Sequence, residues 1–326
     1  MNTRLLGKTG YHVSEIGLGT WQLGGDFGPV SQESADEILS SARSLGVNFW
    51  DTADVYGAGL SESRIGSFGD RKNVFVATKL GRGPQFEGMT KYNKARVKES
   101  LQGSLQKLRV ETLDLAQLHC IPTQVLRDGE IFSIMDDMQA EGLVRHWGAS
   151  VENVEEALLC LKQPGLSTLQ IIFNLLRQDC AWEVLPKAKA ANVGVIVRLP
   201  LASGLLSGKW TKDTTFPAQD HRNYNRDGQA FNVGETFAGL PFGKGVELVD
   251  SGLKTRLPSG MTLPHFALRW ILDHEAVSTV IAGVSKPMQL RGNVEASGLA
   301  HLTPDVHTQL SDWYKKDVRS YIRGSI

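Results

Sequence analysis

The sequence lacks an excess of charge of either sign. Its 326 residues contain 35 Lys plus Arg and 35 Asp plus Glu, so the formal net charge is zero. Proteins that bind nucleic acid or an anionic membrane surface through charge carry a basic surface. The balance therefore gives no support to either class of partner, although it is compatible with a local basic pocket for a single phosphate.

Cysteine and long apolar segments are also scarce. The three cysteines, at positions 120, 160 and 180, include no close pair and cannot all be paired, which favours reduced thiols. No uncharged apolar run approaches the ~18 residues of a membrane-spanning helix, and the best candidate, 193–206, contains Arg198. Residues 1–8 hold no apolar core of signal-peptide length. We therefore expect a cytoplasmic protein without a membrane anchor.

A third absence concerns the Gly-x-Gly-x-x-Gly loop that binds dinucleotides in open parallel sheets. After the first expected strand the sequence reads Gly17-Leu18-Gly19-Thr20-Trp21, in which the third glycine is missing. This departure argues against an open dinucleotide-binding sheet.

Strand-like and helix-like patterns alternate through most of the chain. Segments with helical apolar spacing lie at 33–45, 94–108, 129–140, 154–161 and 182–191, and Gly46 and Gly142 mark two helix ends. Between them, strand-like apolar runs lie at 13–18, 48–50, 74–79, 113–119, 144–149, 169–173, 194–199 and 278–282. This alternation indicates a parallel sheet covered by helices. Eight such units predict an α/β protein with a closed (β/α)8 TIM barrel, formed by residues 1–326 as one domain.

Three segments depart from the repeat. Residues 4–13 predict a β-hairpin that turns near residues 7–10 and plugs one end of the barrel. Residues 306–322 predict a final amphipathic helix on the outside. Residues 209–260 are long and rich in Gly, Asp, Asn and Thr, and segments of this kind are usually functional or disordered. Their aromatic residues favour a lid over a bound ligand: Phe216, Tyr224, Phe231, Phe237 and Phe242.

Four side chains that can exchange or share a proton lie at or just after strand ends: Asp51, Tyr56, Lys79 and His119. The carboxyl ends of parallel strands meet at one face, so these side chains should come together. An ammonium beside a phenol lowers the pKa of the phenol, and a carboxylate keeps the ammonium charged. The alternatives are a structural salt bridge at the barrel mouth and a metal site at Asp51 and His119. No His-x-His pair follows the first strand, so we expect no metal.

The motifs around these residues closely resemble the aldo-keto reductase family. They are Asp51-Thr52-Ala53-Asp54-Val55-Tyr56-Gly57, Thr78-Lys79 and Asp114-Leu115-Ala116-Gln117-Leu118-His119. The resemblance implies an NADP(H)-dependent reductase that transfers hydride to an aldehyde or ketone. Tyr56 would protonate the carbonyl oxygen, Lys79 and Asp51 would assist it, and His119 would orient the carbonyl. Trp21, Tyr56 and His119 would line the substrate pocket.

The resemblance also implies a set of cofactor contacts. A helix starting near Pro287, after Gly283 and Ser285, would offer backbone N–H groups to the 2′-phosphate, although an ordinary capped helix has the same pattern. Two positions depart from the family: Val151 replaces a frequent Asn, and Arg198 replaces a frequent aromatic residue. The implied cofactor-binding residues are Thr20, Trp21, Asp51, Ser150, Gln170, Arg198, Leu201, Ser203, Gly204, Leu205, Lys209, Gly283, Ser285, Lys286, Gln289 and Asn293.

Two alternative functions stay open at this point. The same site would serve an NAD(P)-dependent sugar or alcohol dehydrogenase that works in the opposite direction. Some relatives are cofactor-binding regulatory subunits of potassium channels, and the four active-site residues are compatible with that role as well. The sequence contains no additional partner-binding segment, which favours a free-standing enzyme acting on a small carbonyl compound.

Overall fold

Eight parallel strands close into a barrel in the computed structural model, which describes residues 1–326 apart from the side chain of Met89. Strand β10 pairs with β9 on one side and with β3 on the other, which closes the ring. The predicted (β/α)8 fold is therefore confirmed. The barrel strands are β3 (Ile16–Gly19), β4 (Phe49–Asp51), β5 (Phe75–Leu80), β6 (Leu113–His119), β7 (Val144–Ser150), β8 (Thr168–Ile172), β9 (Gly194–Arg198) and β10 (Val277–Gly283).

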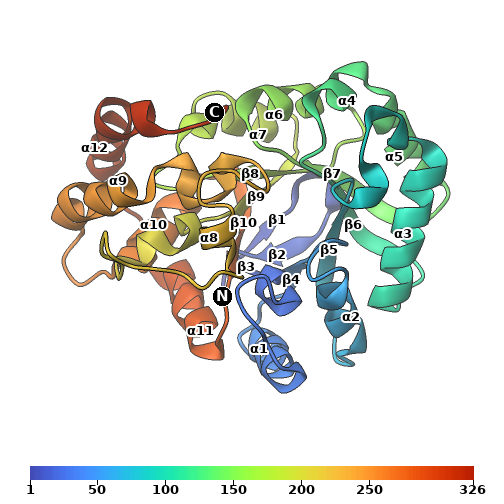
Figure 1. Ribbon diagram of the computed structural model, residues 1–326, viewed down its shortest axis with the longest axis horizontal. Helices are drawn as coiled ribbons and strands as arrows, with labels where there is room; N and C mark the ends of the chain where they lie inside the picture. Colours follow the sequence, from blue (N-terminus) through green and yellow to red (C-terminus); the bar gives the residue numbers. More distant parts are fainter.

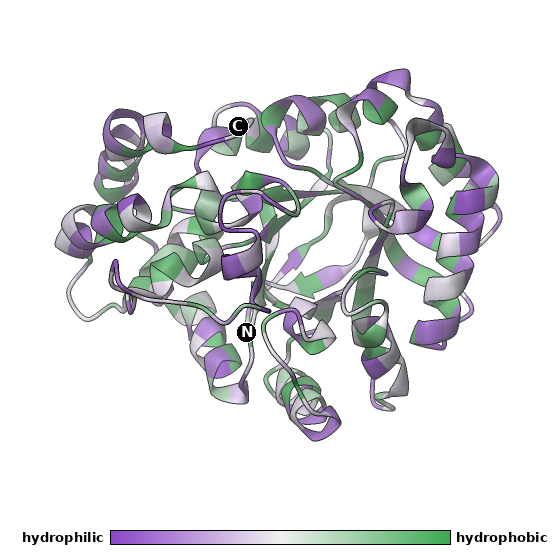
Figure 2. Cartoon of the chain, viewed as in Figure 1, coloured by the Kyte–Doolittle hydropathy of each residue, from purple (hydrophilic) through white to green (hydrophobic). Residues whose placement is uncertain are grey.

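Helices surround the ring of strands (Figure 1). The five helices predicted from apolar spacing are present. Helices at 60–67, 123–128, 221–224, 242–247 and 263–272 were not predicted. Hydrophobic residues concentrate on the strands and on the helix faces that meet them (Figure 2). The helices are α1 (Gln32–Ser44), α2 (Leu60–Ser67), α3 (Lys94–Leu108), α4 (Thr123–Asp128), α5 (Glu130–Ala140), α6 (Val154–Leu161), α7 (Val184–Ala190), α8 (His221–Tyr224), α9 (Phe242–Glu247), α10 (Leu263–Leu272), α11 (Pro287–Glu295) and α12 (Pro304–Trp313).

Side-chain caps and left-handed glycines define several helix ends. Ser31 accepts a hydrogen bond from the backbone N–H of Ser34 before α1, and Asn153 does the same for Glu156 before α6. Such caps satisfy N–H groups that have no partner within the helix. Gly46, with φ of 74°, follows α1 and ends it as predicted.

The amino-terminal hairpin consists of β1 (Thr3–Leu5) and β2 (His12–Ser14), joined by a tight turn. Leu6 and Val13 pack into a buried cluster with interior residues of the barrel, including Phe49, Leu115 and Ile196. The hairpin therefore closes the amino-terminal end of the barrel, as predicted. Figure 1 shows it through the ring of strands.

One predicted strand, 13–18, proves to be two. Residues up to Ser14 pair antiparallel with β1, whereas residues from Ile16 pair parallel with β10 and β4. Glu15 lies between them and forms a partly buried ion pair with Arg4 at 2.6 Å. The chain changes partners at this residue, so the single-strand prediction was wrong in detail.

The segment 209–260 is more ordered than its composition suggested. It contains α8, α9 and a π-helical turn at Leu248–Leu253. Four aromatic rings form one cluster with centroids between 4.9 and 6.1 Å apart, and they belong to Trp210, Phe216, Phe237 and Phe242. Aromatic packing of this kind offsets the entropy lost on ordering the backbone. We call this segment the lid.

The final helix is shorter than predicted. Helix α12 ends at Trp313, and a π-helical turn (Tyr314–Val318) and a 3-10 turn (Arg319–Tyr321) continue the chain. Tyr314 and Arg319 both donate hydrogen bonds to the carboxylate of Asp179, which hold these last turns against the barrel. Among the described residues, no helix is long and apolar enough to cross a membrane.

Candidate active site

Three neighbouring strands bring the predicted acid–base residues together at the barrel mouth. Asp51 ends β4, Lys79 lies near the end of β5, and His119 ends β6. Tyr56 follows in the loop before α2. The ammonium of Lys79 pairs with Asp51, donates to the carbonyl oxygen of Thr52 at 2.8 Å, and lies 3.2 Å from the hydroxyl oxygen of Tyr56. The carboxylate, the ammonium and the phenol thus form one connected chain.

Burial and charge shift the pKa values of Lys79 and Tyr56 in opposite directions. Burial would lower the pKa of Lys79, but Asp51 and Tyr56 raise it above its ordinary value, so the lysine stays charged. Burial raises the pKa of Tyr56, and Lys79 lowers it by a smaller amount. The net pKa of Tyr56 is therefore raised, contrary to the lowering expected from the sequence. A phenol in this state is protonated near neutrality and can donate a proton.

His119 is buried beside these groups and neutral. Burial lowers its pKa well below the ordinary value, and Arg82, Lys79 and Arg198 lower it further. Its ring lies edge-on to the ring of Tyr56, with centroids 5.9 Å apart. Within the described part of the chain, its Nδ1 atom has no hydrogen-bond partner.

Two glutamine side chains support Asp51 from neighbouring strands. Gln170 on β8 donates to Oδ2 of Asp51 at 2.8 Å, and Gln117 on β6 donates to the same oxygen at 3.2 Å. Ser150 is buried and donates to Oε1 of Gln170 at 3.4 Å. The sequence analysis did not single out Gln117. Gln117 lies two residues before His119, so both side chains are on the same face of β6. This spacing could have identified Gln117 from the sequence.

A cavity of about 1210 Å³ extends from the acid–base residues across the barrel mouth. Four of the predicted residues lie outside its wall: Lys79, Ser150 and Leu205 are buried behind it, and Lys286 is exposed beyond it. The predicted residues that line it are Thr20, Trp21, Asp51, Tyr56, His119, Gln170, Arg198, Leu201, Ser203, Gly204, Lys209, Gly283, Ser285, Gln289 and Asn293.

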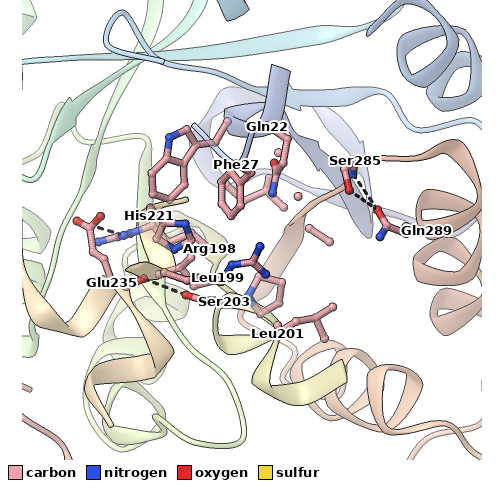
Figure 3. A pocket seen from close by; sticks show the side chains of 18 of the residues that line it. Gln22, Phe27, Arg198, Leu199, Leu201, Ser203, His221, Glu235, Ser285 and Gln289 are labelled. Carbon is pink, nitrogen blue, oxygen red and sulfur yellow. Dashed lines mark hydrogen bonds and ion pairs between the residues drawn. The ribbon is translucent and has the colours of Figure 1, made fainter. Parts of the chain in front are cut away.

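The far end of the cavity reaches the first turn of α11. Oε1 of Gln289 accepts from the backbone N–H of Ser285 at 2.8 Å and from that of Lys286 at 3.2 Å. The same N–H groups would suit a phosphate if Gln289 turned away. Figure 3 shows Ser285 and Gln289 at one end of the cavity and Arg198 with Glu235 at the other.

A tight loop after β9 forms another part of the cavity wall. Ala202, Ser203 and Gly204 have positive φ values of 47°, 53° and 96°. A Cβ atom on Gly204 would lie 2.4 Å from the ring of Trp210, so only glycine fits here. The cavity length, this loop and the N–H groups before α11 together fit a dinucleotide cofactor.

Aromatic side chains form one wall beside Tyr56. The ring of Trp21 stacks on that of Tyr56 with centroids 5.7 Å apart, and Phe27 meets Trp21 edge-on at 5.0 Å. His221 and Phe231 of the lid pack on the same indole. The sequence analysis predicted Trp21 here but missed Phe27 and His221.

Another part of the cavity wall carries an ionic cluster that the sequence analysis largely missed. Arg82 contacts the Glu235 carboxylate with both terminal nitrogens, at 2.9 and 3.1 Å. Arg198 lies 3.5 Å from the same carboxylate and donates to the carbonyl oxygen of Val151 at 3.1 Å. Glu152 lies 3.8 Å from Arg82. These partners therefore hold the guanidinium of Arg198 in place. It does not project freely into the cavity, as the aromatic residue frequent at this position in the family would.

The ionic cluster also contains three groups with metal-ligating atoms. Ligand atoms of Cys120, Glu152 and Glu235 lie within 4.8 Å of one another. Burial raises the pKa of Cys120 to about 12, so this thiol keeps its proton. Since the guanidinium groups of Arg82 and Arg198 already pair with Glu235, the cluster is better described as an ion-pair network.

Comparison with known proteins agrees with the site geometry. A model of the Aldo/keto reductase family matches residues 15–315. Aldo-keto reductase YhdN from Bacillus subtilis is 31% identical over 98% of this chain and 93% of its own. A probable voltage-gated potassium channel subunit beta from Oryza sativa is 30% identical over 94% of both chains. The structure of glycerol dehydrogenase AKR11B4 from Gluconobacter oxydans is 30% identical, with a TM-score of 0.78 over 100% of this chain and 98% of its own.

The family model spans nearly the whole barrel, and the relatives align along almost their full lengths. Fold, strand-end residues and cavity agree with this match. The chain belongs to the aldo/keto reductase family.

Proposed function

We propose that this protein is an NADP(H)-dependent reductase that converts an aldehyde or ketone to an alcohol. The observation that carries the proposal is the connected chain of Asp51, Lys79 and Tyr56 beside neutral His119, at the floor of a cavity long enough for a dinucleotide. The residues fit proton donation to a carbonyl oxygen next to a hydride source. When bound, the cofactor supplies that hydride.

The chain's own residues would position and protonate the carbonyl. Tyr56 donates its proton to the carbonyl oxygen, and the nearby Lys79 ammonium stabilises the negative charge that develops on the phenol oxygen. Asp51, held by Gln117 and Gln170, keeps that ammonium in place. Neutral His119 offers a ring nitrogen to the carbonyl. Trp21 shields this side of the pocket from water.

The cofactor would lie along the cavity from Gln170 to the first turn of α11. Its nicotinamide end would meet Thr20, Trp21, Asp51, Gln170 and Arg198, with Ser150 supporting Gln170 from behind the wall. Its pyrophosphate would meet the loop after β9, at Leu201, Ser203, Gly204 and Lys209, with Leu205 packed behind that loop. Gly283, Ser285, Lys286, Gln289 and Asn293 would hold the adenosine end. Residues 1–326 would form a single barrel domain, and the lid would fold over the bound cofactor. The cysteines are unpaired, which suits a protein of the cytoplasm.

Two relatives support alternative uses of the same site. The glycerol dehydrogenase named above suggests an NAD(P)-dependent alcohol or sugar dehydrogenase working in the opposite direction. The potassium channel subunit suggests a cofactor-binding regulatory role. The direct test is a steady-state screen of aldehydes, ketones and sugars with NADPH and NADH, followed by nicotinamide absorbance. Turnover with NADPH and a small aldehyde supports the reductase. Cofactor binding without turnover of any compound in either direction would favour the regulatory role.

A further inference from the structure

The ionic cluster at the substrate end of the cavity has a specific charge arrangement. Arg82 comes from the loop after β5, Arg198 from the end of β9, and Glu235 from the lid. Burial alone would raise the pKa of Glu235, but Arg82 and Arg198 lower it to about 2. Glu235 is therefore ionised and offsets one of the two positive charges of the guanidinium groups.

This wall presents hydrogen-bond donors and acceptors side by side. All three side chains line the cavity, as do Tyr56 and His119. Arg198 retains a buried Nε–H group that has no partner among the described residues. A hydroxyl group both donates and accepts, so it can bond a guanidinium and the carboxylate together. An apolar group would leave these polar atoms desolvated, and an anion would meet the carboxylate of Glu235.

We propose that Glu235 is a specificity-determining residue that, with Arg82 and Arg198, makes this site select neutral hydroxylated carbonyl compounds over anionic and apolar ones. The proposal rests on the reductase function above and names its substrate class. The aromatic rings of Trp21 and Phe27, which line the same cavity, suit the carbon skeleton of such a compound.

Charge-removal variants test this assignment. In Glu235→Gln the amide keeps the size of the side chain and removes its charge. Glu247→Gln removes the same charge from the exposed lid surface, where Glu247 pairs with Lys212 and Lys244, and serves as the control. The kcat/KM values of wild type and both variants are measured with NADPH for glyceraldehyde, propanal and succinic semialdehyde. Each variant is compared with wild type as a ratio, so aldehyde hydration cancels.

We expect wild type to prefer glyceraldehyde over propanal and to use succinic semialdehyde least. Glu235→Gln should shift the succinic semialdehyde to glyceraldehyde ratio toward the anion by about 10- to 100-fold, as one charge a few ångströms away in a partly buried site would do. Glu247→Gln should leave the ratio unchanged. Wild-type preference for the anion, an unchanged ratio in Glu235→Gln, or an equal shift in the control would overturn the proposal.

Binding of succinate separates this proposal from the reductase function. Calorimetric titration of succinate into each protein saturated with NADP⁺ needs no turnover. We expect Glu235→Gln to bind succinate at least about 10-fold more tightly than wild type, for the same electrostatic reason. Equal affinity would overturn the role of Glu235. An absence of turnover with every carbonyl, together with tighter succinate binding by the variant, would contradict the reductase and leave the charge selectivity standing.

Discussion

The floor and the lid of the cavity are built in different ways. The floor consists of strand-end residues such as Asp51 and Lys79, which are 2% and 1% exposed and are positioned by the pairing of neighbouring strands. The lid reaches the cavity through short turns, and its residue Glu235 meets Arg82 across 153 positions of sequence. The rigid floor suits a reaction that needs fixed geometry, and the lid can vary without disturbing it. The proposed reaction would then depend on the floor, and the proposed substrate selection on Glu235 of the lid.

Removing the floor's proton donor should have the largest effect. We expect Tyr56→Phe to lower kcat by ~10²–10⁴-fold, as loss of a positioned general acid does, while the Kd of NADPH stays nearly constant. Tyr224→Phe, which removes a hydroxyl from the lid side of the same cavity, should retain most activity. Steady-state kinetics and cofactor fluorescence titration measure both quantities. Near-full activity of Tyr56→Phe would mean that the proton comes from another group.

The adenosine end should show a smaller effect. A lysine facing a 2′-phosphate contributes roughly 1.5–3 kcal/mol to the binding free energy of the cofactor. Because Lys286 is exposed, we expect a contribution near the lower end of this range. We expect Lys286→Met to reduce the preference for NADPH over NADH by about 10-fold. Exposed Lys72, far from the cavity wall, provides the control variant Lys72→Met. Both dissociation constants are measured side by side, and equal weakening of the two cofactors would remove Lys286 from this role.

Acid stability offers a way to compare floor and lid directly. Burial lowers the pKa of His221 in the lid to about 4, and that of His119 in the floor well below its usual value. The unfolded chain takes up these protons near pH 6.5, whereas the folded chain does not, so stability should fall as pH decreases below about 6.5. Each histidine should lower the free energy of unfolding by about 1–2 kcal/mol at pH 5 relative to pH 7.

Unfolding by urea at pH 7 and pH 5 measures this loss. His221→Gln should reduce the loss by about 1–2 kcal/mol, whereas His12→Gln, a change at an exposed histidine, should leave it unchanged. An identical pH dependence in His221→Gln and wild type would show that the lid opens before the histidine titrates.

The smallest change expected is a local one in the lid. Because its turns pack on the cavity through Trp210 and Phe231, NADP⁺ should slow amide hydrogen exchange in residues 209–260. The floor strands and α3 should show little change, since they are already packed in the barrel. Exchange followed by mass spectrometry with and without cofactor tests this. Unchanged exchange throughout the lid at saturating cofactor would contradict its proposed role.

Much of the barrel was predictable because its signals are local. Apolar runs of strand length, helical spacing and glycine stops identify elements within a few residues, and parallel strands then bring their ends together. That reasoning placed Asp51, Lys79 and His119 at one face. It failed at 13–18, where Glu15 separates two strands with different partners. It also failed at 306–322, where the helix ends at Trp313 and irregular turns bonded to Asp179 follow.

The sequence by itself determined the repeat and the hairpin plug, since both depend on spacing along the chain. It also predicted the acid–base residues, from their places at strand ends and from the family motifs around them. Only the tertiary structure decided the balance of burial and charge that raises the pKa of Tyr56, because burial is a property of the packed barrel. It also decided that Glu235 pairs with Arg82 and Arg198. No local pattern encodes contacts between this lid residue, the loop after β5 and the end of β9, since they form only when the barrel closes.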